Sequence, residues 1–430
     1  MRLTNKLYAQ HLGWTFKKHW IVQSKRTPRD TGAAAELKKI GVSVKDVVDL
    51  PEHEAYCNQE KYLKYNFILL VSNKIITNLR LEAINGGKTS LRDDKTHPNW
   101  NLKPCHTFGN SNVLLEGMSQ ALLLTKSVEI PSLPKCIRES MDGIQISGLL
   151  ERKVKEAVMA SHLFSADQVK LPKRRNPLRP EYNLPRDYGI PQKRRVSILI
   201  NKLLSECEKF AGRNINSQRR LLDQANFKVT VPKNDDLLLF DVNVQKIITA
   251  SRPLDAIKGK YDSELPDLHP IKYTISMPKQ HVYIPETIYP FGGNLNGCNP
   301  HTIFVNFNNE EVKNIHDLQI NVSQFQSRNL LKAFSVAAAR AKQLYGDLAF
   351  KNISRPIVVQ SIQTDGRTFH FGVFQLNTLR LDNLEGPKNY WFHQNNEDLF
   401  QLCEYGSGKP TLEGFNKDVF RYICAFYSNA

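Results

Sequence analysis

Two short segments containing glycine and lysine come close to a phosphate-binding P-loop. Residues 82–89 (EAINGGKT) supply the Gly-Lys-Thr end of that motif. However, Glu82 stands where its first glycine belongs, and a carboxylate there would repel phosphate. In residues 403–410 (CEYGSGKP), Cys403 replaces the same glycine and Pro410 replaces the Ser or Thr that would contact Mg²⁺. Both segments are therefore interpreted as turns and not as nucleotide-binding loops.

Residue types that bind metals gather in one polar stretch of the chain. It contains Asp93, Asp94, His97, Cys105 and His106, but without the spacing of a zinc site. The sequence also has no G-x-S-x-G motif and no H-E-x-x-H motif. We therefore expect no metal, no cofactor, no small-molecule substrate and no catalytic residues, which together indicate a protein that is not an enzyme.

The strongest chemical feature is a basic, proline-rich segment at residues 170–195. It holds nine basic residues, two acidic residues and five prolines. Proline at this density blocks helices and sheet ladders, so we expect an extended chain whose Arg and Lys side chains follow a phosphate backbone, while Tyr182 and Tyr188 stack on bases. A solvated linker or a nuclear-localisation-like patch is the alternative interpretation. The RNA-binding residues predicted here are Lys173, Arg174, Arg175, Arg179, Arg186, Lys193, Arg194 and Arg195.

The composition of the 430 residues points to an anionic partner. There are 59 basic and 42 acidic residues, a net charge of +17, which favours RNA, DNA or an acidic membrane surface. The seven cysteines are odd in number and form no C-x-x-C, which argues against a disulfide scaffold and a zinc ribbon. No apolar run approaches the ~18 residues of a membrane span, so no stable membrane insertion is expected.

The N-terminal residues predict import into mitochondria. Residues 1–29 hold seven basic residues and no acidic residue, with apolar and aromatic residues interspersed. This pattern is typical of a mitochondrial transit peptide, and the alternative is a basic arm that stays on the protein. We expect residues 30–110 to form an N-terminal extension and residues 111–430 to form the core.

Hydrophobic periodicity predicts the main elements of that core. Helices are expected at residues 111–126, 196–210 and 323–345, the last ending at Gly346. Short strand-like runs occur at residues 227–231, 237–244 and 302–307. The expected fold is α+β, a mixed sheet that includes a C-terminal β-hairpin and is flanked by amphipathic helices, with long basic extensions.

The hairpin follows Pro356 and is predicted from its turn. Asp-Gly lies between two alternating apolar runs, which is a strong signal for a two-residue turn at Asp365 and Gly366. In that register Ile362 faces Phe369. One face of the hairpin then carries five large apolar residues, enough to pack on a helix.

The C-terminal third of the chain and one earlier segment resemble a known family. Residues 334–346 (FSVAAARAKQLYG), 356–392 (PIVVQSIQTDGRTFHFGVFQLNTLRLDNLEGPKNYWF) and 114–126 (LLEGMSQALLLTK) are similar to blocks of the mitochondrial large-subunit ribosomal protein thirty-seven family. A related mitochondrial ribosomal protein, also described as a programmed-cell-death protein, shares part of the pattern. The blocks are long and have the family's order and spacing.

The resemblance implies a structural constituent of the large subunit of the mitochondrial ribosome, located in the matrix. Its partners would be the large-subunit rRNA and other mitochondrial ribosomal proteins, including the related programmed-cell-death-type protein. The family supplies no catalytic or cofactor residues to carry over. The RNA-binding role of residues 170–195 rests on their charge and not on the family.

Two other functions stay open at this point. The first is a free mitochondrial RNA-binding or RNA-processing factor, which would bind RNA alone with steep salt dependence. The second is a nucleotide hydrolase that uses residues 85–89, for which Lys88→Ala would abolish nucleotide binding.

Overall fold

The computed structural model describes residues 33–41, 104–171, 188–257, 259, 264–280, 287–292, 297–314, 318–382, 385–406 and 409–429. The chain divides into two compact units, residues 1–91 and 92–430. In the first unit the structure describes one helix, α2 (Ala33–Lys39), with Glu36 in its first turn and Lys38 and Lys39 in its last, as the helix dipole favours. The expected transit peptide, residues 82–89 and His97 lie outside the described residues.

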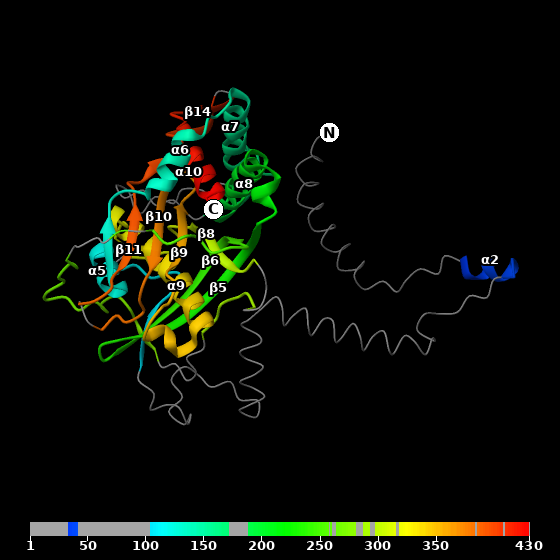
Figure 1. The fold of residues 1–430 in the computed structure, drawn as a ribbon. Helices are drawn as coiled ribbons and strands as arrows, with labels where there is room; N and C mark the ends of the chain where they lie inside the picture. Colours follow the sequence, from blue (N-terminus) through cyan, green and yellow to red (C-terminus); the bar gives the residue numbers. More distant parts are fainter. Residues whose placement is uncertain are drawn as a thin grey trace, which may run out of the picture. The chain divides into compact units, whose positions relative to one another are not determined.

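Ten described strands of the second unit form one mixed sheet (Figure 1). Across the sheet the order is β2 (Ser127–Ile130), β11 (Asn389–His393), β10 (Thr368–Leu376), β9 (Ile357–Thr364), β8 (Asn299–Asn306), β6 (Asp236–Ala250), β1 (Cys105–Phe108) and β7 (Lys279–Gln280). In addition, β5 (Arg219–Lys233) pairs with β6, and β12 (Glu397–Asp398) pairs with β10. Parallel pairs (β1–β6, β8–β9, β11–β2) and antiparallel pairs occur together, so the predicted α+β fold with a mixed sheet is confirmed.

Two small strand pairs lie outside this sheet. They are β3 (Val169–Lys170) with β4 (Tyr188–Gly189), and β13 (Leu402–Gly406) with β14 (Lys409–Glu413). The second pair contains Cys403 and Pro410, so the described residues of the segment 403–410 belong to two paired strands. Residues 407 and 408 lie outside the described residues. The described residues contain no helix that is long and apolar enough to cross a membrane.

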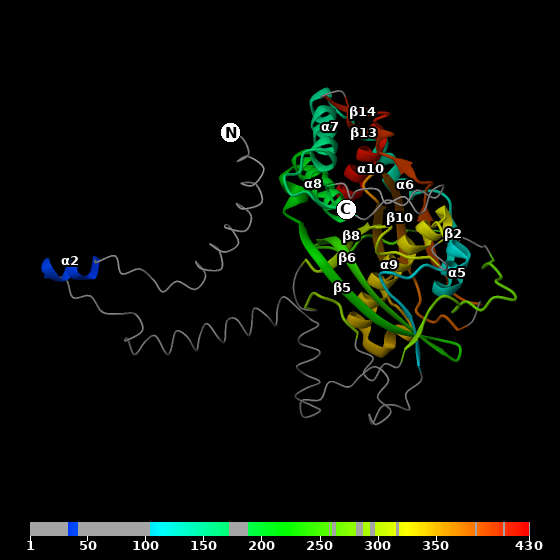
Figure 2. The same cartoon turned by 180° about the vertical axis from the view of Figure 1, so that it is seen from behind.

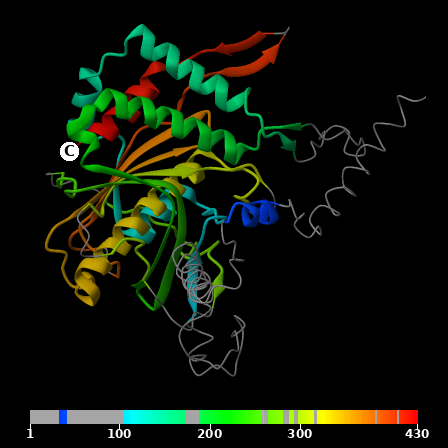
Figure 3. The same ribbon diagram turned by 90° about the vertical axis from the view of Figure 1, so that its right-hand side faces the viewer.

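Helices cover both faces of the sheet (Figure 3). One face packs on α5 (Gly117–Thr125) and α9 (Val322–Tyr345), which is followed by the 3₁₀-helix η3 (Gly346–Phe350). The other face packs on α6 (Lys135–Gly143), α7 (Gly148–His162), α8 (Gln192–Asn216) and α10 (Lys417–Ser428). The sheet therefore separates two hydrophobic cores.

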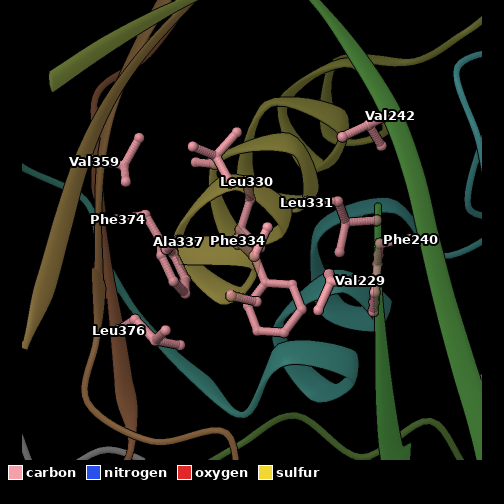
Figure 4. Close-up of a cluster of buried hydrophobic side chains, with 14 of the residues drawn as sticks. Val229, Phe240, Val242, Leu330, Leu331, Phe334, Ala337, Val359, Phe374 and Leu376 are labelled. Atoms are coloured by element: carbon pink, nitrogen blue, oxygen red, sulfur yellow. The ribbon is translucent and has the colours of Figure 1, made fainter. Parts of the chain in front are cut away.

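Helix α9 lies inside the curve of the sheet. Figure 4 shows Leu330, Phe334 and Ala337 of α9 between side chains of β5 and β6 on one side and of β9 and β10 on the other. Every residue from Gln324 to Ala341 is buried. Burying a Leu or Phe side chain stabilises the fold by about 1.5–3 kcal/mol, so this helix organises one core. The predicted end at Gly346 is confirmed.

The start of α9 is fixed by polar side chains. Asn321 accepts a hydrogen bond from Gln324 N at 2.7 Å, and the Gln324 side chain accepts one from Asn321 N at 3.1 Å. This capping box satisfies two amide groups that have no partner within the helix. The same Gln324 amide donates to Leu114 O and Leu115 O, which ties the segment before α5 to α9.

Helix α5 begins later than the sequence predicted. Gly117 has φ of +54°, and a Cβ there would lie 2.8–2.9 Å from the backbone of Ser323 and Gln324. Met118 N donates to Ser323 Oγ at 2.8 Å. The close approach to α9 requires glycine at this position, so the helix expected from residue 111 starts only at Gly117.

Helix α8 begins earlier than predicted and contains a break. Residues 192–195 were expected to be extended, but they form the first turn of α8, with Pro191 as its N-cap. Proline is tolerated at a helix start, because the first amides have no partner within the helix. Gly212, where the sequence predicted an end, has φ of +77°, and helical residues continue to Asn216 beyond this kink.

The long hairpin of β5 and β6 exceeds the predicted strands at residues 227–231 and 237–244. Its strands pair from Arg219↔Ala250 to Lys233↔Asp236. In Figure 2 the hairpin runs from beneath α8 along the length of α9. Strand β6 pairs with β1 through its first residues and with β8 through its last, and it places polar residues near the start of α9.

The C-terminal hairpin β9–β10 is confirmed, but its predicted register was wrong by two residues. Ile362 pairs with Phe371 and not with Phe369. Asp365 Oδ1 accepts hydrogen bonds from Arg367 N and Thr368 N, both at 2.8 Å, so the turn residues are Gly366 and Arg367. A shift of two keeps every side chain on its face. The five predicted apolar residues therefore still pack together on the helices of one face: Val358, Ile362, Phe369, Phe371 and Val373.

Candidate nucleic-acid interface

A polar cavity of about 700 Å³ opens where three parts of the second unit meet. The first turns of α8 contribute Lys193 and Arg194. The hairpin of β5 and β6 contributes Asp223 and Lys246, and the first half of α9 contributes Arg328 together with Lys332. The long hairpin and the early start of α8 are therefore what bring these charges together.

Three acidic residues of the described lining are paired with three of its basic residues. Arg194 Nη2 lies 2.7 Å from Asp167 Oδ2, and Lys193 Nζ lies 3.9 Å from Glu311 Oε1. Lys246 Nζ forms an ion pair with Asp223. The lining thus has five basic residues (Lys193, Arg194, Lys246, Arg328, Lys332) and three carboxylates (Asp167, Asp223, Glu311), a formal net charge of 5 − 3 = +2.

Arg328 is the most unusual member of the lining. Arg328 is only 5% exposed. Its Nε and Nη1 atoms have no hydrogen-bond partner among the described residues. Burial lowers the pKa of Arg328 to about 10, and the nearby Glu311 raises it. The guanidinium is still charged at neutral pH, so the cavity contains a buried cation whose donors are not satisfied.

Lys332 lies one helical turn after Arg328, on the same face of α9. It is 3% exposed, and its Nζ donates to Asn243 O of β6 at 2.6 Å. Burial lowers the pKa of Lys332 well below its ordinary value, and the Arg328 charge lowers it further. An anion between the two side chains would oppose this decrease in the pKa, because it favours the charged form of Lys332.

The eight residues predicted to bind RNA do not lie at one site in the structure. Lys173, Arg174, Arg175, Arg179 and Arg186 lie outside the described residues. Lys193 and Arg194 line the cavity, while Arg195 lines a second hollow of about 300 Å³ with Asp365 and Arg367.

The sequence did not single out Arg328 and Lys332 as binding residues, although both lie in the helix predicted at residues 323–345. Two cations four residues apart share one helix face, and this spacing was visible in the sequence. Nothing in the sequence showed that the helix is buried on all sides, which is what makes the pair distinctive.

A second polar cluster lies inside the core and contains histidine and serine. His393 Nε2 lies 2.7 Å from Glu129 Oε1, and His393 Nδ1 lies 3.2 Å from His370 Nε2. Asn329 then connects His370 to Ser361 by hydrogen bonds. The asparagine separates the serine from the imidazole, so these residues are not arranged as a nucleophile and its base.

This cluster has a structural explanation. His370 is fully buried, and burial together with the neighbouring His393 lowers its pKa well below the ordinary value. A neutral imidazole can accept one hydrogen bond and donate another, which satisfies the polar groups between α9 and the sheet. Among the described residues there is also no group of three His, Cys, Asp or Glu residues that could bind a metal.

Taken together, the fold and the cavity define a basic α+β protein with a cavity whose lining carries more basic than acidic residues. A family model described as mitochondrial 28S ribosomal protein S30 (PDCD9) matches residues 307–430. Large ribosomal subunit protein mL37 of Rattus norvegicus is 30% identical over 313 residues, which cover 71% of this chain and 68% of that protein. The Mus musculus protein of the same name is 30% identical over 343 residues, covering 76% and 75%.

The Bos taurus protein of that name is 28% identical over 348 residues, which cover 77% of this chain and 76% of the relative. The chain belongs to the family of large ribosomal subunit protein mL37. The family expected from the sequence is thereby confirmed, and so is the expected localisation in the mitochondrion. The homology supports a structural role in the ribosome.

Proposed function

We propose that this chain is a structural constituent of the large subunit of the mitochondrial ribosome, where it contributes to translation by binding rRNA and neighbouring ribosomal proteins. The observation that carries the proposal is the 30% identity to proteins named as large ribosomal subunit protein mL37, over more than two thirds of both chains. The net charge of +17 supports an RNA partner, because phosphate neutralisation supplies much of the affinity for RNA.

The basic segment at residues 170–195 is proposed as one rRNA contact. Its two ends are held together, since Val169 and Lys170 pair with Gly189 and Tyr188. Tyr188 is exposed, and Lys170 Nζ lies 5.9 Å from the centre of its ring, a combination that suits stacking on a base next to a phosphate. The chain between these ends carries five of the eight predicted RNA-binding residues.

Contacts to neighbouring ribosomal proteins, including the related programmed-cell-death-type protein, are also proposed. Exposed apolar side chains support them. Phe164 at the end of α7 and Tyr405 on β13 are both exposed, and their rings meet edge to face with centroids 6.4 Å apart. Aromatic side chains of this kind are enriched at protein interfaces.

The division of the chain is proposed as well. Residues 1–29 would be a mitochondrial transit peptide, residues 30–110 an N-terminal extension, and residues 111–430 the core that assembles into the subunit. The basic, acid-free composition of residues 1–29 supports the first of these.

The test is sedimentation of a tagged chain from a mitochondrial lysate on a sucrose gradient, with and without EDTA. Co-migration with the large subunit that persists after EDTA separates the subunits is the expected result. Migration at the top of the gradient while ribosomes remain intact would contradict the proposal. It would favour the free RNA-binding or RNA-processing factor, or a nucleotide-binding protein whose binding depends on Lys88.

A further inference from the structure

The cavity between α8, β6 and α9 has its cations and carboxylates at different depths. Lys246, Arg328 and Lys332 are buried, whereas the side chains of Asp223, Asp167 and Glu311 are each more than half exposed. Exposed ion pairs contribute little, because water and salt screen them. The floor of the cavity is therefore positive and its rim is mixed, an arrangement that attracts an anion inward.

Two donors of the Arg328 guanidinium on the floor are not used within the described protein, whereas Lys332 and Lys246 each have a partner. Arg328 Nε and Nη1 lack hydrogen-bond partners there, and neither Arg328 nor Lys332 forms an ion pair with a described carboxylate. A buried guanidinium without partners is costly to the fold. Its planar fork matches two oxygens of one phosphate, which would satisfy it.

Acceptors in the same cavity are also unused. Gln245 Oε1 on β6 and Asn306 Oδ1 at the end of β8 are buried, line the cavity, and have no hydrogen-bond partner among the described residues. A simple anion offers no hydrogen to them. A ribose hydroxyl or a base amine does, so the cavity presents both halves of what a ribonucleotide requires.

We propose that this cavity binds one nucleotide of an RNA strand, with its phosphate against Arg328 and Lys332 and its ribose or base against Gln245 and Asn306. A volume of about 700 Å³ is in the range of small-molecule sites and accommodates a nucleotide. The inference rests on the proposed function for the choice of RNA as the source of the phosphate. The site itself follows from the orphaned donors and acceptors.

The first experiment measures binding of a fluorescent oligoribonucleotide to the purified full-length chain, in competition with an oligodeoxyribonucleotide, a mononucleotide and inorganic phosphate. Arg328→Gln and Lys332→Gln are each expected to weaken oligoribonucleotide binding at least tenfold. The matched control is Arg340→Gln, a buried arginine on the same helix whose guanidinium bonds to Gln343 and Asn299, away from the cavity. Its affinity is expected to stay within twofold of wild type.

Thermal melting of the variants distinguishes a binding role of Arg328 from a structural role. Because Arg328 is an unsatisfied buried charge, Arg328→Met is expected to raise the melting temperature while it lowers RNA affinity, as is typical of binding residues that are held at a cost to stability. If Arg328→Met melts lower and binds RNA like wild type, Arg328 is a structural residue and the proposal is wrong.

The competitors identify the source of the phosphate. Stronger competition by the ribose strand than by the deoxyribose strand supports an RNA nucleotide. Equal competition by the mononucleotide or by inorganic phosphate, lost in Arg328→Gln, would overturn the RNA strand as ligand and leave a site for free phosphate compounds.

Sedimentation separates this inference from the proposed function. If wild type co-migrates with the large subunit but Arg328→Gln binds RNA normally, the inference fails and the ribosomal role stands. If wild type stays at the top of the gradient while Arg328-dependent RNA binding persists, the ribosomal role fails and the site stands.

Discussion

The Sγ atoms of Cys207 on α8 and Cys424 on α10 lie 3.4 Å apart inside the core, where both residues are free thiols. This contact joins two helices that cover the same face of the sheet. Burial raises the pKa of the Cys207 thiol well above its ordinary value, and the hydrogen bond with Cys424 raises it further. The reactive thiolate is therefore suppressed although a second thiol is adjacent.

Thiol labelling of the native chain should follow exposure. Cys136 in α6 is exposed and is expected to react with maleimide first, while Cys207 and Cys424 should react only after unfolding in guanidinium. Mass spectrometry of peptides after timed labelling measures the order. Early modification of Cys207 in the folded chain would show that α8 and α10 do not pack as described.

Gly372 on β10 is predicted to tolerate no side chain. A Cβ at this position would overlap the ring of Trp391, which is fully buried on the neighbouring strand β11. Overpacking of a core typically costs about 1–3 kcal/mol, so Gly372→Ala should lower the free energy of unfolding by at least that amount. Urea unfolding followed by tryptophan fluorescence measures this free energy.

The control is Gly148→Ala at the start of α7. The added methyl group meets no atom within 4 Å there, so the free energy of unfolding should be unchanged or slightly higher.

His301 on β8 should make the protein less stable in acid. Burial, together with the charge of Arg219, lowers the pKa of His301 to about 3, although its hydrogen bond to Asn429 O raises it. Below pH 6.5 the unfolded chain protonates this imidazole and the folded chain does not, so the free energy of unfolding falls as the pH decreases from 6.5 towards 3. Between pH 6.5 and pH 5 the loss is up to about 2 kcal/mol, at roughly 1.4 kcal/mol per pH unit.

Urea denaturation at pH 7, 6 and 5 tests this for wild type and His301→Gln. Glutamine has no charge to gain, so the variant is expected to be less stable at pH 7 and to show a shallower decrease towards pH 5. Parallel curves for the two proteins would mean that His301 titrates normally in the folded chain.

The parts of the fold that were predictable from the sequence are those encoded by a long local pattern. α9 has 24 residues of helical spacing and a glycine at its end, and β9–β10 has two alternating runs around one turn. The early start of α8 was not predicted, because prolines were expected to interrupt helices. Pro191 precedes the first turn, where an amide N–H has no partner within the helix, so its absence does not destabilise the helix. The hairpin register depended on which of Asp365 and Gly366 begins the turn, and only the side-chain hydrogen bonds of Asp365 decide that.

The cavity could not be predicted, for a different reason. Arg194, Lys246 and Arg328 are far apart in sequence, and only the strand pairing of β6 with β5 and β8 brings them together. No local pattern marks Arg328 as buried, because an arginine on a helix is usually solvated. Tertiary structure, and not composition, therefore distinguishes this cation from the other basic residues of the chain.

The basic segment itself yields the last prediction. Replacing Arg174, Arg175, Arg194 and Arg195 with glutamate should weaken incorporation of the chain into the large subunit, because four phosphate-neutralising groups become repulsive.

Two separate double variants show which part of the segment is responsible. Arg174→Glu with Arg175→Glu acts on the chain between β3 and β4, while Arg194→Glu with Arg195→Glu acts on the first turn of α8 and also breaks the ion pair of Arg194 with Asp167. A matched control is Arg152→Glu with Lys135→Glu on α7 and α6, which changes the net charge by the same amount at exposed i, i+4 pairs. Sedimentation of each tagged variant measures the fraction in the subunit. Normal incorporation of both charge-reversed pairs would disprove an rRNA contact at residues 170–195 without affecting the family assignment, and a loss confined to the α8 pair would place the contact at the first turn of α8.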